Sequence, residues 1–207
     1  LQSNGRVFLI NPNGIVFGRD ARVDVNGLVA STLNLSNRDF LRRRRTFTAG
    51  AHAGPIVNQG AITTPAGGKV QLIAPDIENS GIISSPDGDV LLAAGRSVKL
   101  VDSAEPDIAV LISAPQDRAA NLGQIVAHSG AVGIFGGLVS QQGTISADHA
   151  AAGEGGRIYL RASGTASVQS GSSTSADGGT GGRVRIEGAR TVGAGSVAAT
   201  GEAQEGG

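Results

Sequence analysis

The chain has 207 residues, including 33 glycines, 17 basic and 17 acidic side chains, 40% hydrophobic residues and 3% aromatic residues. So few large side chains exclude a thick globular core, and so many apolar residues exclude a disordered chain, which leaves a thin core repeated many times. The zero net charge gives no general electrostatic hold on nucleic acid, and no apolar run reaches the roughly 18 residues that a membrane helix needs.

Two short apolar runs flank a tight turn near the start of the chain. Val, Ile and Phe favour strands, so residues 7–10 and 15–17 are predicted to be short strands. Between them, in residues 11–14, the proline suits position i+1 of a β-turn, the second asparagine i+2 and the glycine i+3. The first asparagine can bond the backbone two residues on, which predicts a stiff corner. This corner is either purely structural or also a landmark for a partner.

The motif Asn11-Pro12-Asn13-Gly14-Ile15, with residues 4–10 before it and 26–32 after it, resembles the secretion domain of filamentous-haemagglutinin-type exoproteins. Within that family it is most similar to the high-molecular-weight adhesin and haem-haemopexin-binding branch. The resemblance implies a two-partner secretion passenger of a Gram-negative bacterium, secreted or held at the cell surface. An outer-membrane β-barrel transporter with periplasmic POTRA domains would carry it across. The resemblance also implies that the region needed for export includes Asn11, Pro12, Asn13, Gly14 and Ile15.

A repeat follows the motif. Residues 58–74 and 79–94 share one pattern: Gly-x-Ile, a turn of small residues, then Gly-x-Val-x-Leu-x-Ala. Most gaps between the anchoring glycines are one or two multiples of about 21 residues, the period of one coil of a parallel β-helix. These glycines are predicted to sit at corners that need positive φ. The anchors are Gly27, Gly60, Gly81, Gly123, Gly143 and Gly164.

We therefore predict an all-β fold, a right-handed parallel β-helix with short hairpin insertions outside the coils. Roughly ten coils, stacked about 4.8 Å apart, would make a rod on the order of 45–50 Å long. Alternation along the strands should send Thr, Ser, Gln, Lys and Arg outward. The residues predicted to point inward are Ile62, Val70, Leu72, Ala74, Ile83, Val90, Leu92, Ile145, Ile158, Leu160, Val184 and Ile186.

Two segments interrupt the repeat. The first, residues 36–55, is predicted to form a flap that packs on the rod through Phe40, Phe47 and Leu41. The second, residues 101–121, is predicted to be an extra hairpin. The first segment also carries a basic run, which is either a contact site for heparin, nucleic acid or a partner, or a solvated loop tip. This run is Arg42, Arg43, Arg44 and Arg45.

The resemblance extends to about residue 150. Residues 1–150 are therefore expected to be the C-terminal part of a secretion domain whose N-terminal cap is missing. Residues 151–207 are expected to continue the β-helix repeats of a fibre. Because the chain starts at Leu1 and not at Met, we expect an internal fragment. The absence of cysteine suits a chain that must cross a pore unfolded from an oxidising compartment, or it is due to chance or to an intracellular protein.

No residue is predicted to be catalytic or to bind a cofactor or a metal. The acidic pairs Asp76/Glu78 and Asp87/Asp89 have the composition of the paired carboxylates that polysaccharide-cleaving enzymes use, but solvated turns carry such pairs for solubility. The glycine-rich residues 177–182 lack the repeated Asp of a calcium site. The three histidines have no metal-ligand spacing. The sequence therefore favours a protein that is not an enzyme.

We expect an exported surface protein, formed by the export-signal part of an adhesin-like exoprotein and the first coils of its fibre. Its expected partners are the outer-membrane transporter and a host cell-surface protein or glycan, with no nucleic acid and no membrane span. Two alternatives stay open. One is the stalk of a contact-dependent growth inhibition toxin, whose activity would lie in a C-terminal domain. The other is a β-helix enzyme that acts on polysaccharides.

Overall fold

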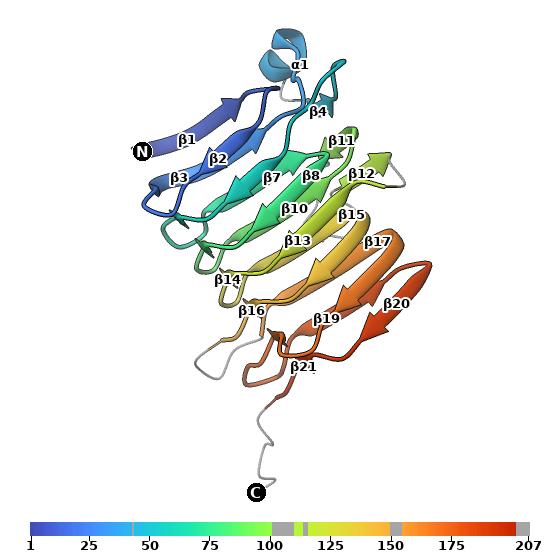
Figure 1. Ribbon diagram of the computed structural model, residues 1–207. Helices are drawn as coiled ribbons and strands as arrows, with labels where there is room; N and C mark the ends of the chain where they lie inside the picture. The colour runs from blue at the N-terminus through green and yellow to red at the C-terminus, as the bar shows by residue number, and fades with distance from the viewer. Residues whose placement is uncertain (43, 101–109, 114–115, 150–154, 202–207) are drawn as a thin grey trace, which may run out of the picture.

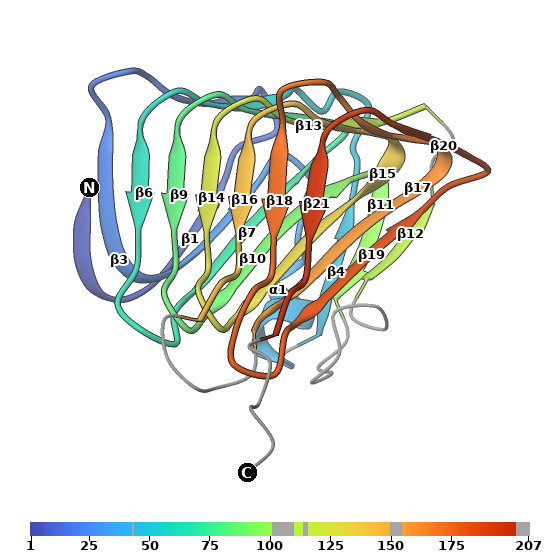
Figure 2. The same cartoon turned by 90° about the horizontal axis from the view of Figure 1, so that it is seen from below.

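The computed structural model describes residues 1–42, 44–100, 110–113, 116–149 and 155–201. The chain winds into a right-handed coil of short strands, each paired in parallel with the equivalent strand of the next coil. Every coil has three faces, and Figure 2 shows the strands of one face standing side by side along the rod. The parallel β-helix predicted from the repeat is confirmed.

Each strand of the rod belongs to one of three faces, and the longest strands bend round a corner to serve two of them. The first face contains β1 (Gln2–Ile10), β3 (Arg22–Ser31), β7 (Lys69–Ala74), β10 (Asp89–Ala94), β15 (Ala131–Gln141), β17 (Arg157–Val168) and β19 (Arg183–Glu187). The second face contains β2 (Ile15–Phe17), β5 (Ile56–Asn58), β8 (Asp76–Asn79), β13 (Arg118–Asn121), the ends of β15 and β17, and β20 (Arg190–Gly193). The third face contains the start of β3, β6 (Ala61–Thr63), β9 (Ile82–Ser84), β14 (Gln124–Val126), β16 (Thr144–Ser146), β18 (Ser173–Ser175) and β21 (Ser196–Ala198).

The core of the rod is a continuous column of apolar side chains that point inward from all three faces. In the parallel ladders like side chains stack on like, as where Ile62 pairs with Ile83. All residues predicted to point inward contribute to this column, although Val184 and Ile186 in the last coil are only partly buried. Because a coil buries its apolar side chains only with the help of its neighbours, stability comes from stacking.

The two insertions combine into one small antiparallel sheet, which we call the flap sheet. It consists of β4 (Arg45–Thr48), β11 (Ser97–Leu100) and β12 (Val110–Ser113), with β11 in the middle. The short helix α1 (Asn37–Leu41) precedes β4 and projects from the rod (Figure 1). The antiparallel pairing of β11 with β12 confirms a hairpin outside the coils, but its predicted bounds of 101–121 are wrong. The hairpin begins at Ser97, and residues 118–121 form β13 of the rod. Residues 101–109 and 114–115 lie outside the described residues. The pairing of β4 with β11 was not predicted.

The predicted flap contacts are confirmed in part. Phe47 is fully buried beneath the flap sheet. Phe40 is 49% exposed, and its ring packs edge-to-face on Phe8 of β1 with 5.2 Å between centroids. The prediction for Leu41 is wrong, because this side chain is 80% exposed.

The flap sheet covers a second apolar cluster on the outside of the first face. Val29, Ile73 and Phe135 point outward from the rod and are at most 3% exposed. They pack with Phe47 and Val98 of the flap sheet. The expectation that outward positions are polar is therefore wrong on this face, because the flap sheet replaces solvent there.

The coils are fewer than the roughly ten predicted. On the first face, seven strands stack in order from β1 to β19. The insertions use part of the chain, and the later coils are longer. Gln124 pairs with Thr144, 20 residues on, but Thr144 pairs with Ser173, 29 residues on.

Four of the six predicted glycine anchors form a column at one corner of the coil, and two are wrong. Gly27 pairs with Lys69 on the first face, and Gly164 lies at a bend of β17. A Cβ on Gly81 would lie 2.2 Å from the Gly60 carbonyl oxygen. The column glycines do not have positive φ, contrary to expectation, and the close approach of neighbouring backbones is what excludes a side chain. The column is Gly60, Gly81, Gly123 and Gly143.

Candidate functional site

The corner at residues 11–14 joins β1 on the first face to β2 on the second. The Gly14 N–H donates to the Asn11 carbonyl oxygen at 3.2 Å, which closes the expected turn. The Asn13 N–H donates to the side-chain oxygen of Asn11 at 3.2 Å, as the sequence predicts. Gly14 has a φ of +117°, which side chains rarely allow. The local geometry of the motif therefore follows from its own residues.

A loop of the next coil holds the corner in place. The Gly54 N–H donates to the Pro12 carbonyl oxygen at 2.8 Å, and the Ile15 N–H donates to the Pro55 carbonyl oxygen at 3.0 Å. A Cβ on Gly54 would lie 2.6 Å from the Asn13 carbonyl oxygen, so only glycine allows this approach. Backbone bonds on both sides therefore make the corner rigid.

The corner presents its two asparagine side chains to solvent. Asn11 and Asn13 are exposed, whereas Ile15 is 6% exposed and anchors the motif in the core. The side-chain oxygen of Asn11 already accepts the hydrogen bond from the Asn13 N–H within the turn. The Asn13 side chain makes no hydrogen bond within the described part of the chain, so its amide can both donate and accept. A rigid turn with a free amide is suited to recognition by a partner.

The arginine run lies at the same end of the rod as the corner. Arg42 caps the C-terminus of α1, Arg44 is exposed, and Arg45 begins β4 and is half-buried. Arg43 lies outside the described residues. The insertion that carries α1 follows β3 of the second coil, but α1 packs back on β1, which leads directly into the corner (Figure 1). The sequence did not predict this proximity.

A ladder of buried amide side chains runs through the coils and was missed from the sequence. Asn58 donates to Asn79 at 2.7 Å, Asn79 donates to Asn121 at 2.8 Å, and Asn121 donates to Gln141 at 2.8 Å. All four side chains are buried. The signal was present, because each amide precedes a glycine of the corner column by two residues. Buried amides satisfied by their equivalents in neighbouring coils fix the register of the stack.

The acidic pairs considered for catalysis carry surface ion pairs. The Arg118 Nε atom lies 3.2 Å from Asp76, and its Nη2 atom lies 3.7 Å from Glu78. Lys69 lies 2.7 Å from Asp89. Within the described ranges, no three or more His, Cys, Asp or Glu residues group as metal ligands, and no helix is long and apolar enough to cross a membrane.

One carboxyl group is buried at the base of the flap. Asp117 is 8% exposed and stands where the chain returns to the rod, 3.8 Å from Arg96, where the chain leaves it. Burial raises the pKa of Asp117 above its usual value, and the positive charge of Arg96 opposes this shift. The pair therefore closes the insertion at its base.

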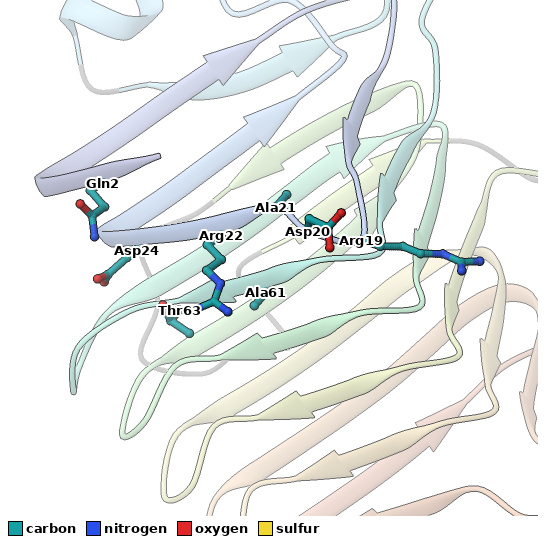
Figure 3. Close-up of a pocket in the computed structure, with 8 residues that line it drawn as sticks. All are labelled: Gln2, Arg19, Asp20, Ala21, Arg22, Asp24, Ala61 and Thr63. Carbon is teal, nitrogen blue, oxygen red and sulfur yellow. The ribbon is translucent and has the colours of Figure 1, made fainter.

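An open depression lies near the N-terminal end of the rod (Figure 3). Arg22 and Asp24 of β3 lie in it beside Thr63, and Asp20 lies beyond Ala21 on the side of Arg19 (Figure 3). Arg19 extends away from the other side chains (Figure 3). The lining therefore carries both signs of charge, and no single sign predominates among its residues.

The stacked coils and the anchored Asn-Pro-Asn-Gly corner define the class of the protein by its fold, a parallel β-helix. The model of the TPS secretion domain, the domain of two-partner secretion, matches residues 1–205, and the chain belongs to this family. Its structure is similar to the crystal structure of the HMW1 secretion domain from Haemophilus influenzae, with 36% sequence identity and a TM-score of 0.82. That match covers 94% of this chain and 53% of the other, so the chain spans about half the length of this relative. No curated protein matches the sequence.

These comparisons confirm the predicted family and the likeness to the high-molecular-weight adhesin branch. The haem-haemopexin-binding branch is not confirmed. The expected division at residue 150 stays a prediction. Strand pairing continues on both sides of that position, with β15 on β17 and β16 on β18.

Proposed function

We propose that this chain is the part of a larger exoprotein that an outer-membrane transporter recognises for export. The partner would be a β-barrel with periplasmic POTRA domains, and the exoprotein would reach the surface of a Gram-negative bacterium or the medium. Membership of the TPS secretion domain family supports this route. The observation that carries the proposal is the corner, which backbone bonds to Gly54 and Pro55 hold rigid while the Asn13 amide faces solvent.

Coil-by-coil folding would help the export. The chain would leave the barrel unfolded, and each finished coil would offer an open parallel edge to the next. The ladders support this order, because every strand of the rod pairs with strands of adjacent coils. Apolar burial and hydrogen bonds formed outside would then oppose backward movement into the pore.

The whole exoprotein is proposed to be an adhesin that binds a host cell-surface protein or glycan. The likeness to the HMW1 secretion domain supports this class, and the ligand-binding part would lie in chain beyond these residues. A non-enzymatic role is supported by the carboxylates first considered for catalysis, since Asp76, Glu78 and Asp89 are engaged in surface ion pairs.

The test of the export role is a secretion assay with the intact exoprotein and its transporter. Replacing Asn11 and Asn13 together by Ala should sharply reduce the amount of exoprotein outside the cell. Asn13→Ala alone is the sharper variant, because the turn bonds of Asn11 and Gly14 stay intact and only the exposed amide is lost. It should also reduce export, since recognition, and not folding, is affected.

The matched control replaces two exposed amide side chains at another corner of the coil. Gln59 and Gln142 are exposed, and their joint replacement by Ala should leave export unchanged. Circular dichroism of each purified variant would show that the β-helix still forms. Normal export of the Asn13→Ala variant and of the double asparagine variant would refute the role given to the corner.

A further inference from the structure

The flap carries a small projecting surface of unusual composition, which we call the basic knob. It consists of Arg38, Phe40, Leu41, Arg42 and Arg44. The knob projects beyond the end of β1 in Figure 1. Its backbone is ordered by hydrogen bonds from the Arg42 N–H to the Arg38 carbonyl oxygen at 3.1 Å and from the Arg44 N–H to the Asp39 carbonyl oxygen at 2.8 Å. The side chains are therefore presented on a fixed scaffold.

Two apolar side chains of the knob face solvent. Leu41, at 80%, is the most exposed large hydrophobic residue in the described ranges, and Phe40 is 49% exposed. The T-shaped contact with Phe8 covers only part of Phe40. Single exposed hydrophobic residues are ordinary, whereas here two consecutive ones are exposed on a short projecting helix.

The arginines of the knob are not neutralised by the rest of the described chain. Arg38, Arg42 and Arg44 are exposed and make no ion pair there. By contrast, Lys69 and Arg118 on the rod are paired with acidic side chains. The neighbouring carboxylate, Asp39, accepts a hydrogen bond from the Ser36 hydroxyl group at 2.7 Å within the helix cap. The knob is therefore a local positive surface on a chain of zero net charge.

The small area of the knob distinguishes between a protein partner and a lipid bilayer. A stable protein interface uses about 800 Å² and about 20 residues from each partner, which the few residues of the knob cannot supply alone. Binding to a bilayer requires a smaller contact area, because each inserted apolar side chain and each cation near an anionic headgroup adds to the binding. We propose that the basic knob binds the surface of an anionic lipid bilayer, with Leu41 and Phe40 between the headgroups and the arginines on lipid phosphates.

The test measures co-sedimentation of the whole 207-residue chain with lipid vesicles. Binding should be strong to vesicles of phosphatidylcholine with phosphatidylglycerol and weak to phosphatidylcholine alone, and added salt should weaken it. Replacing Arg42 and Arg44 by Ser should weaken binding by about fivefold for each arginine removed. Leu41→Ser should weaken it by about tenfold, because the inserted apolar surface is lost.

Two variants serve as matched controls. Arg19→Ser removes an exposed arginine far from α1 along the chain, and Leu122→Ser removes a leucine that is 43% exposed at a corner of the coil. Both should bind vesicles as the unchanged chain does. The proposal is overturned if the chain ignores anionic vesicles, if the knob variants bind like the controls, or if the knob binds heparin or a protein but not lipid.

Discussion

At the scale of single residues, the close approach of neighbouring coils decides which residue types the corner positions allow. The glycines of the corner column stand where the backbones of neighbouring coils nearly touch. The amides two residues before them, at Asn58 and Asn79, use the same proximity to hydrogen-bond between coils. Glycine and asparagine thus share one cause, the short distance between equivalent positions of adjacent coils.

The glycine column gives a test of this proximity. Gly81→Ala would bring a Cβ to 2.2 Å from the Gly60 carbonyl oxygen. Because two coils must shift apart to relieve the overlap, the free energy of unfolding should fall by about 3 kcal/mol. Gly18→Ala is the control, since a Cβ there meets nothing within 4 Å. Urea denaturation would measure both variants, and equal stability would contradict the stacking argument.

At the scale of elements, the flap sheet is a device for covering an apolar outer face. Its strands β4 and β11 come from insertions separated by two coils of the rod, and they meet over Val29 and Ile73. Phe47 of β4 is buried in the cluster that Val29 and Ile73 form with Val98, and this contact joins the flap sheet to the rod. The sheet therefore acts as part of the core, although it lies outside the coils.

Replacing the buried Phe47 of the flap sheet by a small residue should lower the stability of the fold. Phe47→Ala removes a fully buried side chain, and the free energy of unfolding should fall by about 3–5 kcal/mol. The control is Phe40→Ala in the same insertion, where the loss of one edge-to-face contact should cost about 1 kcal/mol. Guanidinium denaturation compares the two. An equally small effect at both positions would show that the flap sheet adds nothing to stability.

At the scale of the whole molecule, the sequence predicts what repeats and fails where segments far apart in the chain meet. The coil period and the inward set followed from alternation, as Ile62 above Ile83 shows. The pairing of β4 with β11 could not be predicted, because neither insertion has a period that links it to the other. The anchor at Gly164 failed because the later coils are longer and a fixed spacing misplaces it.

The turn of the candidate site was predictable for a local reason. Its proline, its first asparagine and its glycine each have a preference that acts within four residues. The hydrogen bonds of the turn to Gly54 and Pro55 were not predictable from the sequence. They depend on the path of the first insertion, which sets where the chain rejoins the rod. The nearness of the basic knob was hidden for the same reason.

Strand pairing predicts a gradient of protection along the rod. Strands β7 and β10 have partners on both sides, whereas β20 and β21 each have one within the described part of the chain. Amide hydrogen exchange should therefore be slower in β7 and β10 than in β20 and β21, by a factor on the order of 100. Mass spectrometry of peptides from each strand would measure it. Uniform rates along the chain would mean that the rod opens as a single unit.

The flap sheet also sets an order of events in time. If the chain emerges from a pore with its N-terminus first, Val29 and Phe47 appear long before Ser97, so the strand that pairs with β4 does not yet exist. Until it arrives, a hydrophobic strip on the growing column faces water. The early coils would then expose a hydrophobic surface that favours association, and this exposure would end when β11 emerges and pairs with β4.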